Sequence, residues 1–189
     1  MNDHDVHAEC LRLLRDGLPE TAHAGLDDGQ EFVPLCLDVD GDIAVVTFLR
    51  RQGDLTRSVP PFIEGWTFHR RDGEWLELGG AGGAAPDQPL ARRSAAELGG
   101  PLLRYGTGKT VRNANRLLPW GAKWVSQARL WVASEVAALR VGSRLLKVPA
   151  HGHAVVVWGA RRAPVVEALS EDGTVLGTLD LGPAIATPA

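Results

Sequence analysis

The segment RYGTGKTVRNANRLLP, residues 104–119, contains the end of a phosphate-binding loop motif. Such loops follow the pattern G-x-x-x-x-G-K-[ST], in which the first glycine lets the backbone curl and point its N–H groups at the phosphates. Gly108, Lys109 and Thr110 match the last three positions, but the first position is Leu103, whose side chain makes the tight curl costly. A nucleoside-triphosphate site is therefore not expected.

Two pairs of histidines have spacings that suit shared metal ligation. His151 and His153 precede a strand, and His4 and His7 lie in a helical segment. Two histidines are half of a zinc site, and no further ligands lie nearby in the sequence. We expect surface positions for both pairs, with no metal and no other cofactor.

A third metal-like pattern is the alternation of Asp38, Asp40 and Asp42, which imitates the start of a calcium loop. A calcium loop has glycine at its sixth position and a bidentate glutamate at its twelfth. Here Gly41 is fourth and the twelfth residue is Leu49, so a hairpin turn explains the pattern better.

No complete catalytic motif is present: there is no G-x-S-x-G elbow, and no Ser or Cys lies beside His and an acid. His69 is expected on the solvent face of a strand. One alternative is open, in which a curved N-terminal sheet forms a small-molecule or enzyme pocket. Trp66, Phe68 and Phe48 would be its walls, and Glu64 its polar group.

Charge is distributed unevenly along the chain. Residues 1–100 carry 18 acidic and 9 basic side chains, whereas residues 101–189 carry 5 acidic and 11 basic ones. Within residues 101–150, Glu135 is the only acid among nine bases. The overall net charge of −3 hides this asymmetry.

The basic segment also contains aromatic residues, and cations with aromatic rings are the combination that binds phosphates and stacks bases. If residues 108–118 are helical, three of its cations share one face. The candidate ligand-binding residues are Arg104, Lys109, Arg112, Arg116, Trp120, Lys123 and Trp124.

Two interpretations of this segment compete. In the first, it docks against the acidic N-terminal half of the same chain, with charge setting orientation. In the second, it binds an anionic partner, which could be nucleic acid, another protein that is acidic, or a phosphorylated ligand. The isoelectric point near 6.1 argues against nucleic acid, because nucleic-acid-binding domains are usually basic overall. The first interpretation is preferred, and it predicts a non-catalytic interaction or regulatory protein.

The N-terminal elements can be read from periodicity. Val6, Cys10, Leu13 and Leu14 form one helical stripe that Gly17 ends. Four strand-like segments follow, joined in pairs by Asp40-Gly41 and Asp72-Gly73, which suit two-residue hairpin turns. A four-stranded antiparallel meander is the expected arrangement.

The stretch 79–93 is rich in glycine and is expected to be a linker or a surface excursion. A short helix-permissive stretch follows, with Ser94 as its cap and Gly99-Gly100 as its stop. From residue 126 onward, six short strand signals, the last two joined by Asp172-Gly173, predict a small β-sandwich.

The fold class expected is therefore mainly β with some α: a helix plus antiparallel meander, then a small sandwich. The expected units are 1–80, a linker and basic segment at 81–125, the sandwich at 126–182 and a tail at 183–189.

The C-terminal stretch VPAHGHAVVVWGARRAPVVEALSEDGTVLGTLDL resembles immunoglobulin-like or carboxypeptidase-regulatory-like sandwich modules found in proteins of high-GC bacteria. The shared pattern is a Gly-flanked entry, a Val-rich strand ending in Trp158 and a strand closing on DGTVLG. The resemblance implies an interaction or structural unit. The N-terminal helix and curved sheet are similar in outline to the NTF2-like group, which would imply a pocket in that sheet.

Composition predicts an ordinary folded protein, with 44% apolar and 23% charged residues. The N-terminus lacks the features of a signal peptide, and no stretch has the roughly 20 apolar residues of a membrane helix. A cytoplasmic location without membrane contact is expected. Cys10 and Cys36 are expected to be small buried hydrophobic residues.

Overall fold

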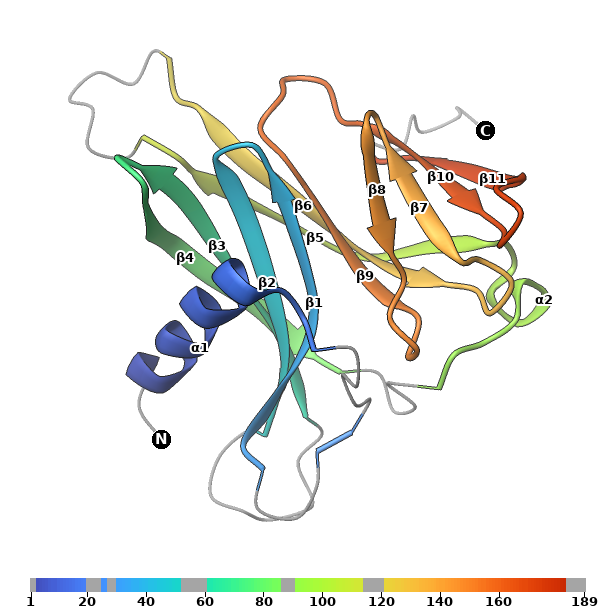
Figure 1. Cartoon of the computed structure of the whole chain (residues 1–189), viewed down its shortest axis with the longest axis horizontal. Coiled ribbons are helices and arrows are strands. Elements are labelled where there is room, and N and C mark those ends of the chain that lie inside the picture. Colours follow the sequence, from blue (N-terminus) through green and yellow to red (C-terminus); the bar gives the residue numbers. More distant parts are fainter. Residues whose placement is uncertain are drawn as a thin grey trace, which may run out of the picture.

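The computed structural model describes residues 3–19, 25–26, 30–51, 61–85, 91–113 and 121–182. These residues form a mainly β fold with an N-terminal helix and antiparallel sheets, so the predicted fold class is confirmed. The helix and three sheets are stacked in layers, with the second sheet between the first and the third (Figure 1). In the described part of the chain, every helix is too short or too polar to cross a membrane.

The first sheet contains the predicted meander, in the order β1-β2-β3-β4. The four strands are Phe32–Asp40, Ile43–Arg50, Phe62–Arg71 and Glu74–Ala84. Gly41 and Asp42 form the first turn, one residue later than expected, while Asp72 and Gly73 form the second as expected. Asp72 and Gly73 both have positive φ angles, 52° and 89°, which is the conformation that favours an Asp-Gly pair.

The helix α1, Asp3–Asp16, covers one face of this sheet. Its predicted stripe of Val6, Cys10 and Leu13 is buried against apolar side chains of β2 and β3. The spacing i, i+4, i+7 places these residues on one side of the helix, so each turn contributes one side chain to the core. Gly17 closes the last turn by donating its N–H to the carbonyl of Leu13 at 2.8 Å.

The second sheet lies on the opposite face of the first sheet and has the order β5-β6-β9. Its strands are Leu102–Val111, Trp124–Val132 and His153–Trp158. Side chains of β9 meet the first sheet on one side and the third sheet on the other. This double burial explains why HAVVVW is uninterrupted by charged residues.

The third sheet completes the C-terminal β-sandwich, in the order β11-β10-β7-β8. Its strands β7, β8, β10 and β11 are Ala138–Val141, Arg144–Lys147, Val165–Leu169 and Val175–Asp180. Leu139 and Val166 of this sheet pack with Leu130, Val156 and Trp158 of the second sheet in one buried cluster. All six strand signals predicted from residue 126 onward correspond to strands.

The described part of the stretch predicted as linker and basic segment, residues 81–125, contributes residues to three β-strands, β4, β5 and β6. β4 continues to Ala84, and β5 is an edge strand of the second sheet. The prediction of a helix at 108–118 is wrong for residues 108–111, which are the last residues of the strand β5. The reason is that these residues pair with β6, and the two strands approach so closely that a Cβ at Gly108 would lie only 2.9 Å from Gln127.

The short helix between these strands is confirmed. It is α2, Ala95–Leu98, and Ser94 caps it in a capping box with Glu97. Gly99 ends it with a φ of 75°. The predicted tail, 183–189, lies outside the described residues.

Candidate anion-binding groove

The phosphate-loop-like residues lie on an extended strand. Gly106 to Thr110 belong to β5 and pair in sequence with β6, from Arg129 to Val125. An extended strand does not point successive N–H groups at one phosphate, so these residues do not form a phosphate-binding loop. They instead place the side chains of Thr107 and Lys109 toward a groove on the second sheet.

The groove consists of two neighbouring hollows of about 600 and 680 Å³. Lys109, Ser126 and Trp158, which are direct neighbours across β5, β6 and β9, line both of them. Leu181 and Gly182, immediately after β11, also line both. Because five residues are shared, the two hollows form one continuous depression.

The groove is strongly cationic. Five basic side chains line it, and the described lining contains no Asp, Glu, His or Cys. A cleft lined by charges of one sign concentrates ions of the opposite sign. The basic residues are Arg104, Lys109, Arg112, Lys123 and Arg161.

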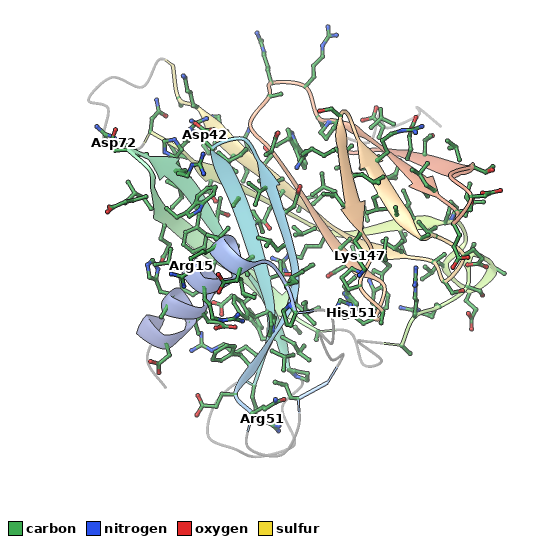
Figure 2. All side chains as sticks on the ribbon, viewed as in Figure 1. Arg15, Asp42, Arg51, Asp72, Lys147 and His151 are labelled. Atoms are coloured by element: carbon green, nitrogen blue, oxygen red, sulfur yellow. The ribbon has the colours of Figure 1, made fainter. Side chains whose placement is uncertain are left out.

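Two of these cations also have structural contacts. Arg104 donates from Nη1 to the carbonyl oxygens of Leu181 and Gly182, at 3.1 and 3.0 Å. These contacts anchor the end of the third sheet but leave the positive charge unneutralised. Arg112 pairs with Asp42 and contacts Nε2 of His69 at 2.8 Å. Figure 2 shows Asp42 at the turn between β1 and β2.

The remaining three cations are more available to a ligand. The ammonium of Lys109 lies 4.7 Å from the centroid of the Trp124 ring, a favourable cation–π distance. Lys123 and Arg161 make no side-chain ion pair with any residue that the structure describes. The backbone N–H of Lys123 donates to Oδ1 of Asn113 at 2.8 Å, which holds the start of β6 beside the end of β5.

The groove also has aromatic surface. Trp124 is 41% exposed, whereas Trp158, on the floor, is only 9% exposed. Tyr105 also lines the first hollow, but its ring packs toward the first sheet, where its hydroxyl bonds to Nδ1 of His153 at 3.0 Å. Burial raises the pKa of the Tyr105 phenol far above its ordinary value, so it stays neutral.

Five of the seven predicted ligand-binding residues line this one groove: Arg104, Lys109, Arg112, Lys123 and Trp124. Arg116 and Trp120 lie outside the described residues. Sequence reasoning missed Arg161 and Trp158. The Arg161-Arg162 pair directly after the Val-rich strand was the available signal, since exposed bases at a strand end can join a neighbouring basic surface.

Two further arginines of the basic segment contact the N-terminal sheet instead. Arg144 forms an ion pair with Asp38, and Arg129 donates to the backbone carbonyls of Ile63 at 3.0 Å and Ala81 at 2.8 Å. Together with the Arg112–Asp42 pair, these contacts join the two charged halves of the chain.

The surface positions expected for His151 and His153 are wrong, because the two residues are only 2% and 0% exposed. Nε2 of His151 donates to the carbonyl of Leu35 at 3.1 Å, and its Nδ1 accepts from the His153 backbone N–H. Burial lowers the pKa of His151, so its imidazole is neutral. Strand pairing draws both residues inward, because they lead directly into the buried strand β9.

The other metal candidates do not converge. His7 contacts Oε2 of Glu77 at 2.8 Å, and the side chain of His4 lies outside the described residues. Asp38 and Asp42 bond to two different arginines, Arg144 and Arg112. Within the described ranges, no group of three or more His, Cys, Asp or Glu side chains could hold a metal ion.

The alternative pocket in the N-terminal sheet is also corrected. Phe48 and Phe68 are 1% and 0% exposed, and Trp66 packs with them in the cluster that α1 fills. Glu64 forms an ion pair with Arg50 at 3.1 Å. The helix occupies the space where a ligand would have to sit, because its apolar stripe needs that same surface.

Both cysteines are buried, as predicted. Burial raises the pKa of the Cys36 thiol to about 12, and it contacts Oγ1 of Thr47 at 2.6 Å. Burial also raises the pKa of Cys10. Both therefore remain thiols near neutral pH and act as packing residues.

Comparison of the chain with protein-family models, with curated proteins and with solved structures gave no match. The resemblance of the C-terminal segment to immunoglobulin-like modules therefore stays a prediction. The groove must be interpreted from its own residues.

Proposed function

We propose that this chain is a non-catalytic interaction protein that binds an anionic partner through the groove between β5, β6, β9 and the end of β11. One observation carries the proposal: five basic side chains line two joined hollows whose described lining has no acidic side chain. Each hollow has a volume within the range of about 300–1,000 Å³ that ligand sites occupy.

The lining supports binding over catalysis. General acid–base chemistry needs a group that exchanges protons near neutral pH, most often an imidazole or a carboxylate. The described groove residues supply neither, and the phenol of Tyr105 is held neutral by burial. Ser126 lies on the floor without a histidine among the lining residues to activate it.

The contacts of the basic residues support a division into two roles. Arg129 and Arg144 are directed at the N-terminal sheet, and we assign them to docking the two halves of the chain. Lys109, Lys123 and Arg161 are directed at the groove, and we assign them to the partner. In this proposal, the acidic half of the chain binds one group of basic residues, and an external anion binds the other group.

The experiment is a calorimetric titration with long-chain inorganic polyphosphate, a polyanion without rings, at 50 and 200 mM salt. The wild-type protein should bind at 50 mM and lose affinity steeply at 200 mM, because counterions released from the polyanion drive binding. The double substitution Lys123→Glu and Arg161→Glu should weaken binding at least tenfold at 50 mM salt.

The matched control is the double substitution Arg15→Glu and Arg71→Glu. Both arginines are exposed and each lies beside an adjacent acid, Asp16 or Asp72, away from the groove. This control makes the same change in net charge and should retain wild-type affinity to within about twofold. Absence of binding at 50 mM salt, or equal weakening by both double variants, would overturn the proposed function.

A further inference from the structure

We infer that the anionic partner is single-stranded nucleic acid, with a base stacked on Trp124 and the phosphate backbone following the cations of the groove. This inference rests on the proposed function and names the ligand class for the same groove. The juxtaposition that carries it is an exposed indole that contacts Lys109 in a hollow lined by further cations.

The side chain of Trp124 is much more exposed than those of the other tryptophans in the second sheet. It is the first residue of β6, 41% exposed, while the other tryptophans of the second sheet, Trp131 and Trp158, are 4% and 9% exposed. A large flat ring left in solvent next to cations is the usual platform for an unpaired base. Since Lys109 lies 4.7 Å from that ring, a phosphate bound to its ammonium would be adjacent to a base on Trp124.

The cations are spread along the groove in a way that suits a chain of phosphates. Arg104 lines only the first hollow, Lys109 lines both, and Lys123 and Arg161 line only the second. A single phosphate can engage one end of such a row. A phosphodiester backbone running across both hollows can engage all of it, which is how grooves for single strands bind.

The same features disfavour other polyanions. A duplex keeps its base faces stacked inside, so it can offer phosphates but no free ring face to Trp124. An acidic peptide offers carboxylates but makes no use of an exposed indole. Thr107 and Ser126 add polar side chains to the first hollow, where the edges of an unstacked base would need hydrogen-bond partners.

The net charge of −3 does not oppose this binding mode, because most of the acidic residues lie in the N-terminal half of the chain. Among the described residues, two carboxylates bond to residues of the groove. Asp42 is paired with Arg112, and Asp180 accepts the backbone N–H of Gly182 at 2.8 Å. Charges farther away than about 8 Å are largely screened at physiological ionic strength, so the local excess of cations decides the potential that a short strand meets.

The test compares two labelled 10-mers that differ only in their bases: oligothymidylate and an abasic phosphodiester chain of the same length and charge. Fluorescence anisotropy at 50 mM salt should show at least tenfold tighter binding of oligothymidylate, the scale expected for one stacked base. With about four phosphate contacts, the logarithm of the oligothymidylate affinity should fall with log salt at a slope of about −2.8.

Trp124→Ala should remove the preference for the base-containing strand while leaving binding of the abasic chain unchanged. The matched control is Trp75→Ala, which removes a tryptophan on β4 that contacts Arg70 outside the groove. It should keep the preference. The wild-type comparison of the two 10-mers needs no variant, so it is decisive even if a substitution impairs folding.

The outcomes separate the two proposals. Equal affinity of the wild-type protein for both 10-mers would overturn the single-strand inference while leaving anion binding intact. Tighter binding of a 10-bp duplex or of poly-glutamate than of oligothymidylate would also overturn it. Failure of the wild-type protein to bind polyphosphate at 50 mM salt would overturn the proposed function itself.

Discussion

The carboxylate of Asp38 and the guanidinium of Arg144 form an ion pair that joins all three sheets. Both oxygens of Asp38, on β1, lie 2.6 Å from Nη1 of Arg144, on β8. The pair also binds both backbone groups of Val157 on β9, whose N–H donates to Asp38 at 2.8 Å and whose carbonyl accepts from Arg144 at 2.9 Å. Because β9 is an edge strand, the pair satisfies backbone groups that have no strand partner.

Replacing Arg144 with methionine should lower the free energy of unfolding by about 3–5 kcal/mol. The substitution leaves Asp38, whose side chain is fully buried, as a charge without the guanidinium that balances it. Urea unfolding of Arg144→Met, Asp38→Asn and the double variant measures the coupling. The double variant should lose clearly less stability than the two single losses combined, and strict additivity would contradict the structural role of the pair.

The loss in Arg144→Met should also shrink as the pH falls from 7 to 5. Burial already raises the pKa of Asp38 above its ordinary 3.8, and Arg144 and the Val157 N–H act against that rise. Removing Arg144 raises the pKa further. A raised folded-state pKa means that stability declines as pH rises through it. Protonation of Asp38 at the lower pH therefore removes the unbalanced charge and restores part of the variant's stability. Urea midpoints at the two pH values check this, and a loss independent of pH would contradict it.

Arg129 should be essential for the contact between the second sheet and the first. It is 7% exposed, and its two terminal nitrogens donate to carbonyls on β3 and β4. Arg129→Met should cost about 1.5–3 kcal/mol because both carbonyls lose a charged donor. Arg129→Lys should recover less than half of the lost stability, because a single ammonium group replaces a planar guanidinium that reaches both carbonyls at once.

The control for this prediction is Arg140→Met. Arg140 is paired with Glu167, and both side chains are substantially exposed. Thermal or urea unfolding should show a change of no more than about 1 kcal/mol for this variant. Equal losses for the Arg129 and Arg140 substitutions would contradict the assigned role of Arg129.

Gly152 should tolerate no side chain. Its φ is 74°, and a Cβ there would lie 2.7 Å from the carbonyl oxygen of Val132. Gly142, in the turn between β7 and β8, has a similar φ of 59° but open space around it. Gly142→Ala should therefore cost only the backbone strain of about 1 kcal/mol, and Gly152→Ala distinctly more. Comparable melting temperatures for the two variants would show that the contact with Val132 is unimportant.

The buried His151 should make the protein less stable in mild acid. Burial lowers the pKa of His151 from its ordinary 6.5. Just below pH 6.5, His151 is therefore protonated in the unfolded chain but stays neutral in the folded chain. Stability should then fall as the pH drops below about 6.5, by up to about 1.4 kcal/mol per pH unit. His151→Gln, which keeps a donor for the carbonyl of Leu35, should flatten this dependence in urea titrations between pH 7.5 and 5. An unchanged slope would argue against the prediction.

The amino-acid sequence alone determined the local elements. The stripe of Val6, Cys10 and Leu13, the Asp72-Gly73 turn and the caps of α2 were predictable because each depends on residues a few positions apart. The clustering of cations along residues 104–124 was visible for the same reason. Charge counts and turn chemistry do not need the rest of the fold.

Only the tertiary structure decided what each basic residue contacts. Nothing local distinguishes Arg129 and Arg144, which contact the first sheet, from Lys123 and Arg161, which face the groove. The direction of each side chain depends on which sheet packs on which face of its strand. The burial of His151 beside Leu35, 116 positions earlier in the chain, was settled in the same way. Such contacts arise from packing between sheets distant in sequence, which periodicity within one segment cannot encode.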